Sequence, residues 1–169
     1  MESRIDYTKV APGAFQALLS LGKYLSHSEL EPELQDLVKL RASQINHCAY
    51  CIDMHWKDLR AQGANEQKLY GLDAWEESPY YTDRERAALA WTEAVTRLDD
   101  GRVSEPVYQL ARRFFSEKEL ADLTLCIIAI NGWNRFNIAF RAPAGTYRPA
   151  PRVRATPPGF RPTRPEASH

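Results

Sequence analysis

The hydrophobic residues of this chain recur mostly every three or four positions, which is the period of an α-helix rather than a strand. Between residues 14 and 25, the large apolar side chains fall on one face of such a helix. A second stripe begins after Pro32, a residue that suits a first helical turn, and continues to Ile45. No segment alternates apolar and polar residues with a period of two, so the sequence predicts no sheet.

Local start and stop signals add further helices. Thr82 with Glu85, and Ser116 with Glu119, match the capping box that opens a helix, and Gly63 is a typical helix end. The predicted helices after residue 45 cover about 48–59, 65–72, 87–95, 106–115 and 120–136. The sequence therefore predicts an all-α bundle of about six to eight helices. Because the helix over 120–136 is apolar on more than one side, self-association is also expected.

Length and composition are those of an ordinary globular domain. The chain has 169 residues, 44% of them hydrophobic, with 22 basic and 22 acidic side chains. This balance removes any global electrostatic argument for nucleic-acid binding. The first residues lack a signal-like apolar region, and no run approaches the roughly 18 apolar residues of a membrane span. We therefore expect a cytoplasmic location, without nucleic-acid or membrane partners.

Composition changes abruptly after Arg141. Residues 142–169 hold seven of the eleven prolines, and five arginines stand against one acid, Glu166. The sequence therefore predicts a helical domain over 1–141 and a Pro/Arg-rich extended or disordered tail over 142–169. The tail could lie on the acidic body of its own chain or of a neighbouring subunit. Since the tail contains no motif residue, its removal is expected to leave the site intact.

The candidate chemistry is concentrated where Cys48 and Cys51 are three residues apart and His55 follows four residues later. In a helix, these three side chains fall on one face. With Asn46 as a plausible cap, both sulfurs would lie in the first turn, where free N–H groups favour a thiolate. Three cysteines without an export signal favour thiol redox chemistry or a metal site over a disulfide framework.

The metal interpretation is the weaker one. A structural zinc site normally has four ligands, the motif offers three, and His47 is the only local fourth. We therefore predict no metal and no cofactor. The third cysteine, Cys126, stands among leucines and isoleucines and is expected to be a buried core residue.

Three segments carry a resemblance to a known family: residues 37–55 with Cys48-Ala-Tyr-Cys51, residues 85–93, and residues 130–136. Together they resemble the AhpD-like alkylhydroperoxidases of the carboxymuconolactone decarboxylase superfamily. The resemblance covers most of residues 1–141 and implies an all-helical fold, trimers or hexamers, and reduction of peroxide by a cysteine pair. The decarboxylase branch lacks that pair, so its reaction is not implied.

The resemblance also implies a proton relay. Family members use a carboxylate twelve residues before the first cysteine, which is Asp36 in this chain, together with both cysteines and the histidine. The usual residue at that position is glutamate, so the side chain here is one methylene shorter. Two other positions differ from the family: His47 stands where glycine is frequent, and Tyr50 where the alkylhydroperoxidase has histidine.

These residues predict a reaction scheme. Cys51 is the candidate nucleophile because His55 lies one turn away, and Cys48 is the candidate resolving thiol. Asp36 would orient the histidine, or alternatively pair with Lys39 or Arg41 on a solvated surface. The predicted partners are a hydroperoxide substrate, a dithiol or thioredoxin-like reductant, and further copies of the chain.

Two other classes of function also use a closely spaced cysteine pair. A thioredoxin-like oxidoreductase has the same cysteine spacing but needs a strand before the helix, and no strand is predicted. The remaining alternative is a non-enzymatic thiol redox sensor or metal-binding adaptor, in which the basic tail contacts a partner. Turnover with peroxide separates an enzyme from a sensor.

Overall fold

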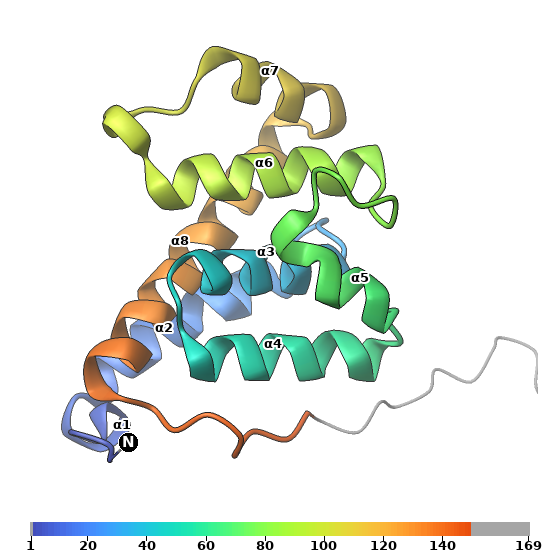
Figure 1. The fold of residues 1–169 in the computed structure, drawn as a ribbon. Helices are drawn as coiled ribbons and strands as arrows, with labels where there is room; N and C mark the ends of the chain where they lie inside the picture. The colour runs from blue at the N-terminus through green and yellow to red at the C-terminus, as the bar shows by residue number, and fades with distance from the viewer. Residues whose placement is uncertain (1, 150–169) are drawn as a thin grey trace, which may run out of the picture.

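The structure is a computed structural model and describes residues 2–149. Within these residues it contains eight α-helices and no strand, which confirms the predicted all-α class (Figure 1). The elements are α1 (Tyr7–Val10), α2 (Pro12–Leu25), α3 (Pro32–Ile45), α4 (Ala49–Gln62), α5 (Glu66–Tyr70), the 3-10 turn η1 (Gly71–Ala74), α6 (Asp83–Arg97), the 3-10 turn η2 (Asp99–Gly101), α7 (Glu105–Phe114) and α8 (Glu117–Phe140). No helix of this described part is both long and apolar enough to cross a bilayer.

Helix α3 lies at the centre of the bundle, against α4, α6 and α8 (Figure 1). Its apolar residues divide between two core clusters. Leu34 and Val38 pack with residues of α2, α6, α7 and α8, whereas Leu37 and Leu40 pack with residues of α4, α5 and α6. A helix that buries opposite sides in this way is fixed in rotation, so it holds its polar residues, including Asp36, at defined positions.

The predicted start and stop signals are confirmed. Thr82 and Ser116 each form a complete capping box, at the start of α6 and α8. Gly63 ends α4 in the left-handed conformation, with φ of 97°, where glycine has no steric cost. Helix α8 is longer than predicted at both ends, and it packs against α2, α3 and α6. The short helix α1 was not predicted.

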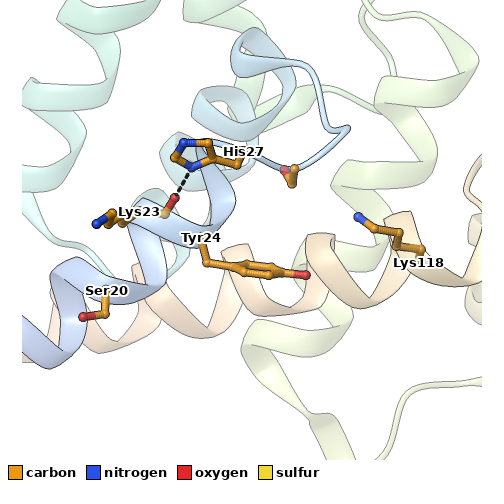
Figure 2. A pocket seen from close by; sticks show the side chains of 6 residues that line it. Ser20, Lys23, Tyr24, His27 and Lys118 are labelled. Atoms are coloured by element: carbon orange, nitrogen blue, oxygen red, sulfur yellow. Dashed lines mark hydrogen bonds between the residues drawn. The ribbon is translucent and has the colours of Figure 1, made fainter.

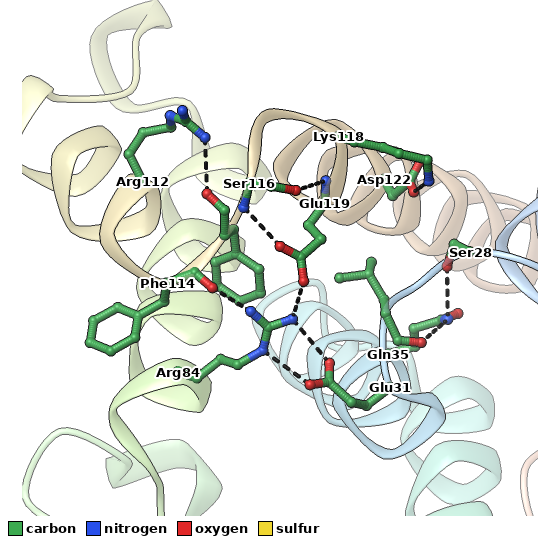
Figure 3. A network of polar contacts seen from close by, with 12 residues as sticks. Ser28, Glu31, Gln35, Arg84, Arg112, Phe114, Ser116, Lys118, Glu119 and Asp122 are labelled. Carbon is green, nitrogen blue, oxygen red and sulfur yellow. Dashed lines mark hydrogen bonds and ion pairs between the residues drawn. The ribbon is translucent and has the colours of Figure 1, made fainter.

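A polar cluster centred on Arg84, in the first turn of α6, joins four helix ends (Figure 3). From α6, the guanidinium bonds Glu31 at the start of α3 through two nitrogens, at 3.1 and 3.2 Å, and Glu119 in the first turn of α8 at 2.6 Å. It also donates to the carbonyl of Phe114 and lies over the ring of Phe115, 4.2 Å from its centroid. This arrangement fixes the ends of α3, α6, α7 and α8 relative to one another.

The chain after α8 runs along α4 rather than away from the body (Figure 1). The backbone N–H of Gly145 donates to Asp53 at 3.1 Å, and Lys57 donates to the carbonyl of Tyr147 at 3.2 Å. The first part of the predicted tail therefore contacts the motif helix. Residues 150–169, which make up most of that predicted tail, lie outside the described residues.

Candidate functional site

A tight turn between α3 and α4 positions the cysteines. Asn46 ends α3, His47 has a positive φ of 57°, and Cys48 is the N-cap of α4, with its Sγ accepting from the N–H of Cys51 at 3.4 Å. The prediction that Asn46 caps the motif helix is wrong, because its amide instead bonds to α8. The left-handed conformation of His47 is one that glycine adopts without steric cost.

Cys48 and Cys51 are joined by a disulfide at the start of α4. Both residues are fully buried, where they pack with Ala42 of α3 and Ile130 of α8. The motif pair is thus held between three helices rather than at the surface. His47 is exposed, so it does not join the cysteines as a buried fourth ligand.

His55 and Asp36 meet across α3 and α4. The Nδ1 atom of His55 lies 3.5 Å from Oδ1 of Asp36, at the outer limit of a hydrogen bond, and 4.0 Å from Oδ2 of Asp58. His55 is only 5% exposed, and its Nδ1 has no full hydrogen bond within the described residues. The shorter carboxylate of aspartate therefore reaches the histidine, but loosely.

Asp36 also takes the structural role that the sequence offered as an alternative. Its carboxylate accepts from Lys39 at 3.2 Å and from Gln62 at 2.5 Å, while Arg41 is bound elsewhere. Burial would raise the pKa of Asp36, but His55, Lys39 and Gln62 outweigh it and lower that pKa to about 2. Asp36 is therefore an anion at neutral pH, and its carboxylate lies beside the ring of His55.

Asp58 is a second carboxylate beside His55, which the sequence did not indicate. It accepts a hydrogen bond from the hydroxyl of Tyr147 at 2.8 Å. Burial and the neighbouring Asp36 raise the pKa of Asp58, and burial and Asp58 raise the pKa of Tyr147. The chain after α8 thus contacts a carboxylate beside His55, and the expectation that removing residues 142–169 leaves the site intact stays a prediction.

An apolar cavity of about 360 Å³ lies against the site. Its lining is mainly aromatic and aliphatic: Tyr7, Phe15, Leu19, Gly22, Leu25, Lys39, Tyr50, Met54, His55, Ala129, Ile130, Trp133 and Asn137. His55 therefore faces the cavity. Cys51 is not among the lining residues, but its sulfur contacts Asn137, which is. A small organic molecule fits such a space better than a large polar one.

A second hollow, of about 560 Å³, has a different character (Figure 2). It is lined by exposed residues of α2 and the loop after it, together with Lys118 of α8; the Lys118 side chain is bound to Asp122 at 2.8 Å. No cysteine or other motif residue lines it. The cavity at His55 is the better candidate for substrate.

Three asparagines on α8 connect it to the motif and were missed from the sequence. Asn131 and Asn134 both accept from the amide of Asn46, at 2.8 and 2.9 Å, and Asn137 donates to Cys51. Their spacing of three residues in an otherwise apolar helix was the available signal, because polar residues recurring on one buried face need partners there. Within residues 2–149, no three His, Cys, Asp or Glu side chains form a group able to hold a metal ion.

Comparison with the sequences of known proteins identifies the family of this chain. The model of the carboxymuconolactone decarboxylase family matches residues 12–94, a range that contains the cysteine pair, His55 and Asp36. YdfG of Bacillus subtilis (strain 168), an uncharacterised protein, is 39% identical over 139 residues, which are 82% of this chain and 95% of YdfG. This chain belongs to the carboxymuconolactone decarboxylase family. It lies in the AhpD-like branch, as the sequence motifs predicted.

Solved structures of related proteins confirm the fold. A protein of unknown function from Agrobacterium tumefaciens, described as a candidate antioxidant defence protein AhpD, has a TM-score of 0.83 and 41% identity, covering 86% of this chain and all of that one. The debrominase Bmp8, in complex with 2,3,4-tribromopyrrole, has a TM-score of 0.72 and 20% identity over 80% of this chain and 73% of its own. At that identity, the likeness to Bmp8 concerns the AhpD-like fold alone.

Proposed function

We propose that this protein reduces organic hydroperoxides to alcohols with the Cys48–Cys51 pair, using electrons from a dithiol reductant. The observation that carries the proposal is a buried cysteine pair, joined as a disulfide, behind an apolar cavity whose wall contains His55 with Asp36 at 3.5 Å. A redox pair, a proton carrier and a substrate-sized space are the parts that such a reaction needs.

The chemistry proceeds in two stages. The thiolate of Cys51 attacks the outer oxygen of the hydroperoxide, the O–O bond breaks, and the departing alkoxide takes a proton to give the alcohol. The thiol of Cys48 then attacks the sulfenic acid on Cys51, forming the disulfide and releasing water. An external dithiol reopens the disulfide by exchange and becomes oxidised itself. In sum, hydroperoxide and dithiol give alcohol, water and oxidised dithiol.

The roles of His55 and Asp36 follow from their surroundings. His55 faces the cavity, with the anionic Asp36 beside it, and can pass a proton to the alkoxide. Asp36 acts as the third group that positions a catalytic imidazole. The apolar, aromatic lining supports a substrate with an alkyl or aryl group rather than hydrogen peroxide.

Peroxide consumption with a dithiol such as dithiothreitol tests the proposal. Cumene hydroperoxide is expected to be reduced faster than hydrogen peroxide. Cys51→Ser should abolish the reaction, whereas Cys48→Ser should react once and leave a sulfenic acid that dimedone traps on Cys51. Cys126→Ser is the matched control, because burial raises the pKa of that thiol to about 11 and keeps it unreactive.

Three results would contradict the proposal. Dimedone labelling of Cys48 in the Cys51→Ser protein, with Cys48→Ser inert, reverses the two roles. Unchanged peroxide consumption in both cysteine variants removes the pair from the reaction. Reversible oxidation of the pair by peroxide without turnover, under every dithiol tried, favours a redox sensor.

Self-association also belongs to this proposal. Ile128 and Ile138 are exposed apolar residues on α8, and they support contact with further copies of the chain, as trimers or hexamers. Sedimentation at micromolar concentration measures it, and a stable monomer would count against this part.

A further inference from the structure

The side chain of Asn137 lies between the sulfur of Cys51 and the hydroxyl of Tyr7. Its Nδ2 atom donates to Sγ of Cys51 at 3.4 Å, and its Oδ1 atom accepts from the hydroxyl of Tyr7 at 2.9 Å. Asn137 is 5% exposed and Cys51 is 0% exposed, so no bulk solvent competes for these bonds. Three elements meet here: α1, the start of α4, and the end of α8.

The Tyr7 bond determines which end of the amide faces the sulfur. A phenol hydroxyl that donates to the amide oxygen leaves the NH₂ group to point towards Cys51. Burial raises the pKa of Tyr7, so this hydroxyl keeps its proton over the physiological range. The ring of Tyr7 is held in turn by Phe15, Phe136 and Phe140, with centroids 5.1 to 6.2 Å away.

Cys126 shows what burial does to a thiol that lacks such a donor. Both Cys51 and Cys126 are fully buried. The only hydrogen-bond partner of Cys126 within the described residues is the carbonyl of Gln35, 4.0 Å away, which can accept from a thiol but cannot stabilise a thiolate. Burial raises the pKa of Cys126 to about 11. Cys51 is buried to the same extent, but the group that contacts its sulfur is the N–H donor of Asn137 instead of a carbonyl acceptor.

We propose that Asn137 is a catalytic residue that holds Cys51 as a thiolate through its amide N–H, and that Tyr7 is a positioning residue that orients this amide. The proposal rests on the function proposed above, in which Cys51 attacks the peroxide. Hydrogen bonds to the charged form of a buried group lower its pKa, which offsets the opposing effect of desolvation. The amide also distinguishes the two cysteines, because Cys48 accepts from a backbone N–H instead.

The test is a pH titration of Cys51 reactivity without peroxide. Reduced Cys48→Ser protein provides the background, since serine keeps an N-cap oxygen for α4 and leaves one reactive thiol. The rate of iodoacetamide labelling at Cys51, followed by mass spectrometry against pH, gives the thiol pKa. Asn137→Ala should raise that pKa by about one unit, so labelling below neutral pH falls about tenfold.

Two further variants separate a donor from a packing role. Asn137→Asp, nearly the same in shape, should raise the pKa further because its carboxylate repels the thiolate. Tyr7→Phe keeps the ring contacts and should give a smaller rise in the same direction. Gln109→Ala is the control, since it removes an amide on α7 that bonds Glu105 and touches no motif residue, and it should leave the pKa unchanged.

An unchanged pKa in both Asn137 variants, with a uniform change of rate at every pH, would overturn the proposal and leave Asn137 as part of the cavity wall. Tyr7→Phe gives the deciding titration if the Asn137 variants do not fold, and an unchanged pKa there overturns the positioning role. Because no peroxide is present, failure of wild-type peroxide turnover would overturn the proposed function and not this assignment.

Discussion

Two polar clusters of this protein differ in how completely their hydrogen bonds are made. At Arg84, every guanidinium nitrogen has a partner, supplied by two carboxylates and the carbonyl of Phe114 (Figure 3). At His55, the buried Nδ1 atom lies 3.5 Å from Asp36 and 4.0 Å from Asp58, without a full hydrogen bond in the described part of the chain.

This difference separates a structural cluster from a candidate catalytic one. A network in which every polar atom has its hydrogen-bond partner is rigid, and it leaves no donor or acceptor to bind a reacting group. A buried polar atom without a close partner costs free energy, so native proteins retain few of them, often at functional sites. On this comparison, changes at His55 should affect chemistry, and changes at Arg84 should affect stability.

The largest expected effect is on activity, at His55. His55→Leu should slow the reaction of hydroperoxide with the reduced protein by about a hundredfold or more, because the general acid is lost. The free energy of unfolding should fall by at most about 1–2 kcal/mol, since Asp36 loses the histidine but keeps Lys39 and Gln62 as partners. Stopped-flow kinetics and urea unfolding measure the two quantities. His27→Leu, at an exposed position in the turn after α2, is the control, and an equal loss of rate there would contradict the prediction.

The second prediction concerns Arg84, where a substitution should lower stability and leave activity unchanged. Arg84→Met should lower the free energy of unfolding by about 1–3 kcal/mol, because Glu119 and the carbonyl of Phe114 lose their partner. The melting temperature should fall by about 2–4 °C per kcal/mol, with the rate per folded molecule retained. Arg97→Met removes a single exposed pair with Glu93 and should cost under about 0.5 kcal/mol. A selective loss of peroxide reactivity in Arg84→Met would remove the distinction between the clusters.

The third prediction concerns acid stability at Asp36. Its pKa is lowered from 3.8 to about 2 in the folded state, so the unfolded chain binds this proton more readily. The stability that it contributes is therefore present above about pH 4 and is lost as the pH falls through about 2. Relative to Asp36→Asn, the wild-type protein should lose about 1–2 kcal/mol between pH 5 and pH 2. Parallel unfolding curves for the two proteins over that range would show that Asp36 is not stabilised as an anion.

The smallest predicted effect tests the contact made by the chain after α8. Tyr147→Phe removes the donor to Asp58 and should lower stability by about 0.5–1 kcal/mol, because a partly buried hydrogen bond is lost. Tyr70→Phe removes a similar bond to Glu66 at an exposed position and should cost less. Equal effects of the two variants in urea unfolding would mean that the contact adds nothing beyond a surface bond.

The cysteine motif was readable because its residues are close together in the sequence. Cys48 is the N-cap of α4, and Cys51 and His55 lie within that helix. The capping boxes at Thr82 and Ser116 were readable for the same reason, since each is a contact between residues three apart. Local signals of this kind do not depend on how the helices pack.

The surroundings of the motif depended on the tertiary structure. Asn137 lies 86 residues from Cys51 and Tyr7 lies 130 residues from Asn137, so only the packing of α1, α4 and α8 brings them together. The long distance between Asp36 and His55 depends on the separation of α3 and α4. The contact of Tyr147 with Asp58 depends on the path of the chain after α8. The sequence by itself determined most of the helices and the candidate reacting groups, because a few neighbouring residues decide both. Only the fold decided which donors and carboxylates surround those groups, because burial and helix packing set distances between residues far apart in the chain.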